Sequence, residues 1–186
     1  MARVLLAGLI ATVLTLAAGA DAHASSVRHT KASTRALVLD KLAGRGPVVL
    51  ATAVAESYWN AVPCGGQIAV LTNLSVPSSL EPTTDGWVTF ESSLGENDLE
   101  APANTYTHCT ISLAHWQWPT RRSMVADWNM FCLTLTHEVG HLLGHKHSLT
   151  RGSVMAPVFT SEANVPEVCR ATRVQPGRTV ARRKGH

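Results

Sequence analysis

The run HEVGHLLGHKH, residues 137–147, constrains this chain of 186 residues more than any other feature. Its first and fifth residues, His137 and His141, are four positions apart. This spacing places two side chains on the same face of an α-helix, one turn from each other. Two imidazoles in that arrangement can share one metal ion. The sequence therefore predicts a helix that keeps one face for a metal site.

The residues around this run predict one long helix over residues 123–143. Apolar side chains recur at spacings of three and four, which is typical of a buried helical face. They are Trp128, Phe131, Leu135, Val139 and Leu142. On a helical wheel the two histidines lie roughly opposite this stripe, beside Met130, Leu133 and Thr134, so the helix is expected to lie between two layers. Gly144 is the expected stop, because glycine adopts the left-handed conformation that ends helices.

A catalytic zinc ion takes three protein ligands and leaves one position for water. Since the chain turns at Gly144, His147 is the expected third ligand, and His145 is the alternative if the helix continues. Glu138 points about 100° away from His137 on the helix. It is therefore expected to accept a proton from the attacking water rather than to bind the metal. The alternative role for Glu138 is that of a solvated helix glutamate.

The sequence HEVGHLLGHKHS resembles the HExxHxxGxxH signature of the metzincin zinc proteases, and Ser148 is similar to the matrixin branch. Met155, in SVMAP, resembles the matrixin Met-turn, which implies an apolar floor beneath the three imidazoles. The resemblance covers residues 137–157. It implies a zinc endopeptidase with Glu138 as the catalytic base and one Zn²⁺ held by His137, His141 and His147.

The same resemblance implies an α+β fold. The expected architecture is a twisted mixed sheet of about five strands, two main helices and a small irregular C-terminal subdomain. Peptide substrates would bind as an extra strand along the sheet edge. The segment after Met155, with Val158 and Phe159, is expected to wall a substrate pocket. The acidic residues at 91, 96, 98 and 100 could bind calcium, but their spacing matches no calcium-binding loop, and a solvated acidic turn is the favoured interpretation.

Further elements follow from pattern and punctuation. A helix is expected over residues 47–61, opened by Pro47 and followed by Pro63. Its apolar face is Val48, Ala51, Val54, Ala55 and Tyr58. Residues 67–76, 87–92 and 106–113 have the β-branched content of strands, and residues 77–85 and 94–104 read as loops. A small helix is expected after Pro166.

The four cysteines indicate two disulfides if the chain is exported, because the exported environment is oxidising. Three pairings are possible. Cys64 with Cys109 and Cys132 with Cys169 is favoured, since each bond would tie a helix or its exit to a later element. Pro63-Cys64-Gly65 is only faintly similar to the matrixin cysteine switch. A zinc site of four cysteines is disfavoured by their wide spacing.

Residues 1–24 are expected to be a signal peptide, with Arg3, an apolar run and a cleavage site at Ala22-His23-Ala24. The alternatives are a membrane anchor, or cleavage after Ala18-Gly19-Ala20. An N-terminal arm or linker over residues 25–46, a catalytic domain over residues 47–169 and a tail over residues 170–186 are expected to follow. The mature protein is expected to be secreted, without membrane contact.

The charge is concentrated at the C-terminus. Residues 170–186 carry six basic and no acidic residues, and the rest of the chain has ten basic and 13 acidic residues. The tail is expected to be disordered and solvated, and the absence of a basic stripe elsewhere argues against nucleic acid. About 160 mature residues suit a single-domain monomer. Two other functions stay open: a secreted binding module stabilised by zinc, and a zinc amidase acting on cell-wall peptides.

Overall fold

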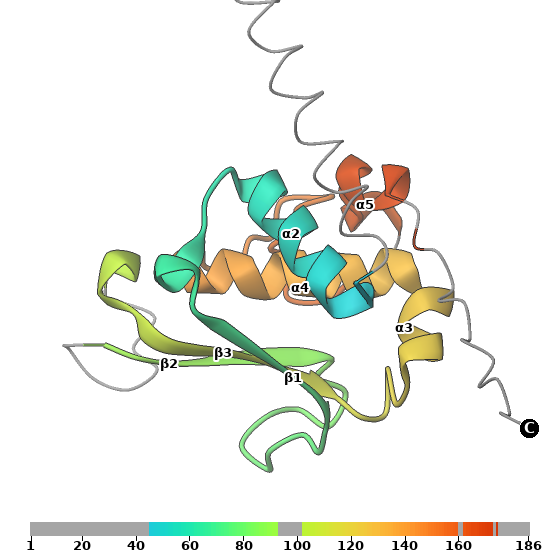
Figure 1. The fold of residues 1–186 in the computed structure, drawn as a ribbon, viewed down its shortest axis with the longest axis horizontal. Coiled ribbons are helices and arrows are strands. Elements are labelled where there is room, and N and C mark those ends of the chain that lie inside the picture. Colours follow the sequence, from blue (N-terminus) through green and yellow to red (C-terminus); the bar gives the residue numbers. More distant parts are fainter. Residues whose placement is uncertain (1–44, 93–101, 160–161, 173, 175–186) are drawn as a thin grey trace, which may run out of the picture. The chain divides into compact units, whose positions relative to one another are not determined.

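The computed structural model describes residues 45–92, 102–159, 162–172 and 174. The predicted signal peptide, nearly all of the predicted arm and most of the basic tail lie outside these residues. The described part is a mixed α+β fold in which α2 and α4 lie on the same side of a small sheet (Figure 1). None of its described helices combines the length and the apolar character that a membrane span requires.

Helix α2, Pro47–Trp59, occupies nearly the range predicted for it. Pro47 stands at its first position, and Asn60 ends it in the left-handed conformation at φ 52°. Leu50, Ala51, Val54 and Ala55 are fully buried. Tyr58, predicted to be on the buried face, is 44% exposed, because the neighbouring Trp59 is the ring that turns toward α4.

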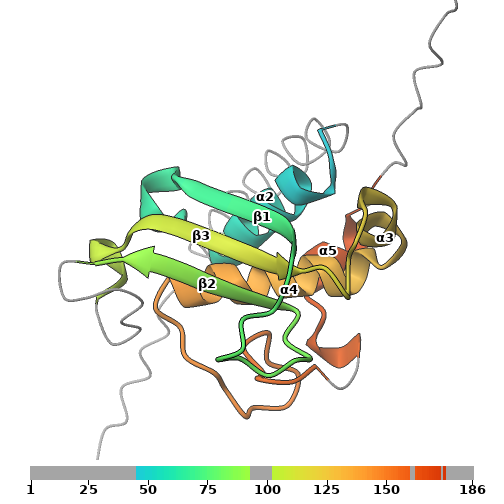
Figure 2. The same ribbon diagram turned by 90° about the horizontal axis from the view of Figure 1, so that it is seen from below.

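The sheet has the order β1-β3-β2. Strands β1, Ile68–Leu74, and β3, Thr107–Ala114, are parallel, whereas β2, Gly86–Glu91, is antiparallel to β3 (Figure 2). The central strand β3 contributes the buried residues Ile111 and Leu113. The described residues thus contain three strands of a mixed sheet, and the expected five are not seen in them.

Helix α4, Trp128–Leu142, is the core of the fold. It contacts β2 and β3 as well as α2 and α5, Glu167–Ala171. All five residues of the predicted apolar stripe are buried, and so are Leu133 and Thr134 on the opposite side. The helix therefore does lie between two layers, and its histidine face is enclosed rather than solvated.

The single helix predicted from residue 123 is wrong at its start. A separate helix α3, Arg121–Ala126, opens with a capping box between Thr120 and Ser123. Asp127 then leaves helical geometry at φ −110° and ψ 42°. Its carboxylate accepts hydrogen bonds from the side chains of Trp118 and Gln117. These tertiary contacts, which sequence spacing does not reveal, accompany the break.

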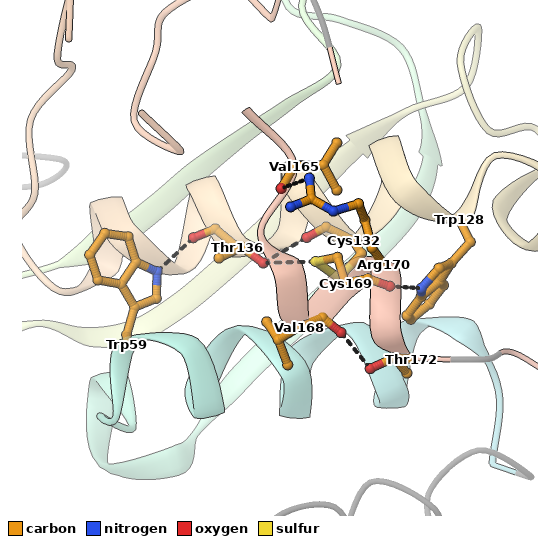
Figure 3. The surroundings of a disulfide bond; sticks show 9 residues. All are labelled: Trp59, Trp128, Cys132, Thr136, Val165, Val168, Cys169, Arg170 and Thr172. Carbon is orange, nitrogen blue, oxygen red and sulfur yellow. Dashed lines mark hydrogen bonds between the residues drawn. A yellow bond between two sulfur atoms is a disulfide. The ribbon is translucent and has the colours of Figure 1, made fainter. Parts of the chain in front are cut away.

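Both cysteine pairs favoured by the sequence are present as disulfides. Cys64–Cys109 joins the short 3₁₀ segment Pro63–Gly66 to β3. Cys132–Cys169 joins α4 to α5 (Figure 3). All four cysteines are consumed, so neither a thiolate switch at Cys64 nor a four-cysteine zinc site is available in this structure.

Candidate metal centre

Three imidazoles converge at the C-terminal end of α4. The Nε2 atom of His141 lies 3.0 Å from Nε2 of His137 and 3.2 Å from Nε2 of His147. One ring nitrogen from each of the three lies within 4.8 Å of the others, which makes them a group able to hold a metal ion. His137 and His141 come from the helix, one turn apart, and His147 comes from the loop beyond Gly144.

The outer nitrogens of the two helical histidines face backbone carbonyls. Nδ1 of His137 lies 2.8 Å from the oxygen of Val154, and Nδ1 of His141 lies 2.9 Å from the oxygen of His145. A carbonyl only accepts hydrogen bonds, so each Nδ1 carries the proton and donates it. Each Nε2 is therefore left with a lone pair that points toward its neighbours, as in histidines that ligate metals.

This donor set fits a divalent cation. Two lone pairs facing each other at 3.0 Å repel unless a positive charge lies between them. Zinc–nitrogen bonds of about 2.0–2.1 Å at a tetrahedral angle would set the nitrogens about 3.3 Å apart. The observed separations of 3.0 and 3.2 Å are close to that value.

Burial also favours neutral imidazoles. The pKa of His137 is lowered to about 4, mainly by burial; the hydrogen bond to the Val154 carbonyl opposes this shift, and the two neighbouring histidines contribute smaller lowering effects. The pKa of His141 is lowered for the same principal reason. Because a protonated imidazole cannot ligate, these shifts keep both rings in the metal-binding form at neutral pH.

Glu138 lies between the first two histidines in sequence but outside the nitrogen cluster. Its side chain is buried where β2 begins. A Cβ added to Gly86, the first residue of β2, would lie 3.2 Å from Oε1 of Glu138. Burial, followed by the charge of Asp85, raises the pKa of Glu138 to about 8. A divalent cation nearby acts in the opposite direction, since it stabilises the carboxylate.

Met155 packs directly against the helix at Gly140, one residue before His141. A Cβ on Gly140 would lie 2.5 Å from the Met155 sulfur and 2.8 Å from Cζ2 of Trp59. The missing side chain thus leaves room for both neighbours. Met155 is 4% exposed, which places a buried thioether close to the histidines.

His145, the alternative ligand, is outside the nitrogen cluster, and its ring stacks on Trp59 at a centroid distance of 4.2 Å. Phe159 lies edge-on to His137 at 5.2 Å. Val158 is 70% exposed. Of the two residues expected to wall a pocket, Phe159 therefore lies against a ligand histidine, and Val158 is mostly exposed.

Sequence reasoning overlooked Gly86 and Trp59. Gly86 opens β2 against Glu138, and Trp59 reaches α4 from the end of α2. A glycine at the start of a predicted strand is a weak hint of close approach. Trp59 gave no such signal, because an indole near the end of an amphipathic helix is ordinarily a packing residue.

The convergent histidines, with Met155 packed against their helix, are similar to the metal site of the matrixins, which are metzincins. The family described as matrixin matches residues 88–169, a range that begins within β2, includes β3, α3 and α4, and ends within α5. The match suggests a zinc-dependent metalloprotease, a hydrolase whose substrates are peptides. No curated protein and no solved structure matches the chain.

Proposed function

We propose that the protein is a secreted zinc endopeptidase that hydrolyses peptide bonds in extracellular proteins. The observation that carries this proposal is the convergence of three Nε2 atoms at the end of a helix that also carries the buried Glu138. His137, His141 and His147 are the proposed zinc ligands, and Glu138 is the proposed catalytic base. The match to matrixins supports the same assignment.

Bound zinc would supply Lewis acidity, which acidifies water and polarises a carbonyl oxygen. The protein's own groups do the remainder. The carbonyls of Val154 and His145 orient the two helical imidazoles. The carboxylate of Glu138 accepts the proton of the attacking water and returns it to the amine that leaves. Its enclosure between α4 and β2 restricts its position for that transfer.

The edge of β2 that faces away from β3 is the proposed peptide-binding edge. Among the described strands, β2 pairs only with β3, and an added peptide strand would pair along its other edge. The same strand begins at Gly86, against Glu138. A peptide paired with β2 would therefore run close to the proposed base. Phe159, beside His137, is the proposed wall of a side-chain pocket, with the exposed Val158 at its rim.

Export is proposed from the N-terminal segment, residues 1–24, with a catalytic domain over residues 47–169. The two disulfides support an oxidising destination. The mature enzyme would act outside the cell as a monomer, without nucleic acid or membrane partners.

The test is the Glu138→Gln substitution in the mature protein. This variant keeps the shape of the side chain but cannot accept the proton, so we expect unchanged zinc content and loss of cleavage of an unfolded protein. Zinc would be measured by metal analysis and turnover by gel assay, with and without a chelator. The exposed glutamate at residue 81 provides a matched control, since Glu81→Gln should retain full activity.

Other outcomes would support other functions. Stoichiometric zinc without cleavage of any protein would favour a binding module stabilised by the metal. Cleavage of cell-wall peptides alone would favour an amidase. Full activity after complete metal removal would contradict all three zinc-dependent hypotheses.

A further inference from the structure

Trp59, the last residue of α2, touches the helix and the loop that carry the proposed ligands. Its Nε1 donates a hydrogen bond of 2.8 Å to the carbonyl of Thr136, as Figure 3 shows. Its ring edge lies against Gly140, where an added Cβ would come within 2.8 Å of Cζ2. Its ring face stacks on His145 at 4.2 Å, with the planes 18° apart.

Each of these contacts adjoins a proposed ligand. Thr136 precedes His137, Gly140 precedes His141, and His145 lies two residues before His147. The hydrogen bond to Thr136 and the close packing at Gly140 hold two successive turns of α4. The third holds the loop. One indole therefore contacts the chain next to all three histidines, although it comes from a different helix.

His145 is the point at which this contact reaches the loop. Its N–H donates to the carbonyl of Gly140 at 2.9 Å, and its own carbonyl accepts from Nδ1 of His141. The loop that follows is exposed, including His147. Aromatic stacking of the His145 ring on Trp59 adds a side-chain anchor to these backbone contacts. Displacement of His145 would move the carbonyl that orients His141 and the segment that carries His147.

We propose that Trp59 is a positioning residue for the metal centre: its indole holds α4 and the loop after Gly144 at the spacing that one ion requires. This inference rests on the proposed zinc site. Groups that orient metal ligands from outside the coordination shell typically contribute about 10–100-fold to metal affinity. Loss of the indole is expected to weaken zinc binding within that range.

The experiment compares Trp59→Leu and Trp59→Phe with the wild-type chain. Zinc affinity would be measured by competition with a chelating indicator, and ligand geometry by the visible absorption of the cobalt-loaded protein. Trp59→Leu removes both the stack and the hydrogen bond, and it should weaken zinc binding by about 10–100-fold. Trp59→Phe keeps a ring against His145 and should recover part of this loss. The cobalt spectrum of Trp59→Leu should change in shape.

Trp128→Leu is the matched control. Trp128 also packs on the core, and its Nε1 also donates to a backbone carbonyl, that of Cys169, at 2.9 Å (Figure 3). It lies at the opposite end of α4 from the three histidines. This variant should lower the melting temperature of the metal-free protein while leaving zinc affinity within about twofold, since no metal-ligand orientation depends on it.

His145→Ala tests the same contact from the other side. It should weaken zinc binding, and its effect should not add fully to that of Trp59→Leu, because both remove one stack. If Trp59→Leu fails to fold, His145→Ala and Trp59→Phe still decide the question. Equal zinc affinities for the wild type, His145→Ala and both Trp59 variants would overturn the inference. Absence of zinc binding in the wild type would instead overturn the proposed function.

Discussion

The three proposed ligands come from two unlike regions. His137 and His141 lie on a buried helix and are 6% and 9% exposed, whereas His147 lies on an exposed loop. The helical pair is set at the correct spacing by helix geometry alone. The loop residue is brought to the same point by several separate contacts. The positions of His137 and His141 therefore follow from local helical structure, whereas the position of His147 depends on tertiary packing.

The loop that carries His147 is short, and its conformation is fixed at Gly144 before this histidine and at Ser148 after it. Gly144 begins it with φ 84°, a conformation that side-chain-bearing residues rarely adopt. Beyond His147, the N–H of Ser148 donates to the carbonyl of Met155 at 2.8 Å. The same segment thus brings His147 to the other two histidines and Met155 to Gly140. Substitutions in the two regions should therefore have different consequences.

The largest expected effect is on the buried region, through the Cys132–Cys169 bond. Replacement of both cysteines by alanine should lower the free energy of unfolding by about 2–5 kcal/mol, as is usual for native disulfides. Urea denaturation without reductant would measure it. The Cys64/Cys109 double variant, whose bond spans a similar length of chain, is the control. Only the first variant, which removes the Cys169 sulfur that contacts Thr136 beside His137, should also weaken zinc binding. Equal zinc affinity in both would contradict this view.

The pH dependence of the metal-free protein should also come from the buried region. His137 has a folded pKa of about 4, below its ordinary value of 6.5, so the unfolded chain binds the proton first as the pH falls. Stability should therefore decline between about pH 6.5 and 4, by on the order of 3 kcal/mol.

Glu138 acts in the opposite sense. Its folded pKa is raised to about 8, above its ordinary value of 4.5. Its contribution to the free energy of unfolding therefore declines as the pH rises from 4.5 to 8. Denaturation curves of Glu138→Gln, with and without His137→Ala, would isolate the histidine. If the free energy of unfolding still changes with pH to the same extent after removal of His137, another group is responsible.

The same substitution at two glycines compares the regions directly. Gly140→Ala places a Cβ within 2.5 Å of the Met155 sulfur and 2.8 Å of the Trp59 ring. Such overpacking should cost about 1–3 kcal/mol and weaken zinc binding. Gly144→Ala meets only Ala103, at 3.3 Å, so its cost is that of the left-handed backbone, about 1–2 kcal/mol. Thermal unfolding and zinc titration would measure the stability and the zinc affinity of both variants. A larger loss of either in Gly144→Ala than in Gly140→Ala would contradict the expected order.

The smallest change in stability is expected at Gly86, which lies outside both regions. Its φ is outside the left-handed range, so alanine is acceptable to the backbone. The added Cβ would press on Thr134 and on Oε1 of Glu138 at 3.1 and 3.2 Å. We expect about 1 kcal/mol of destabilisation, the lower end of the usual range for overpacking. Turnover should fall about tenfold or more with zinc retained, because a small displacement of a catalytic group is costly. Wild-type kcat in this variant would contradict the proposed constraint on Glu138.

Much of the fold followed from patterns that are local in the chain. Helix α2 was predicted from Pro47 and its apolar spacing, and the three strands lie within a few residues of the predicted ranges. The break at Asp127 was not predicted. Its carboxylate accepts hydrogen bonds from Trp118 and Gln117, which lie in the loop before α3. The spacing of apolar residues along the helix carries no information about these contacts.

The sequence alone determined the pairing of His137 with His141, because four residues of helix always bring two side chains onto one face. It also determined where the helix must end, because Gly144 is free to adopt a conformation that its neighbours avoid. Only the tertiary structure decided that Trp59, 77 residues from Thr136, closes on that helix, and that Gly86 confines Glu138. Those contacts depend on how separate elements pack, and no spacing along the chain encodes them.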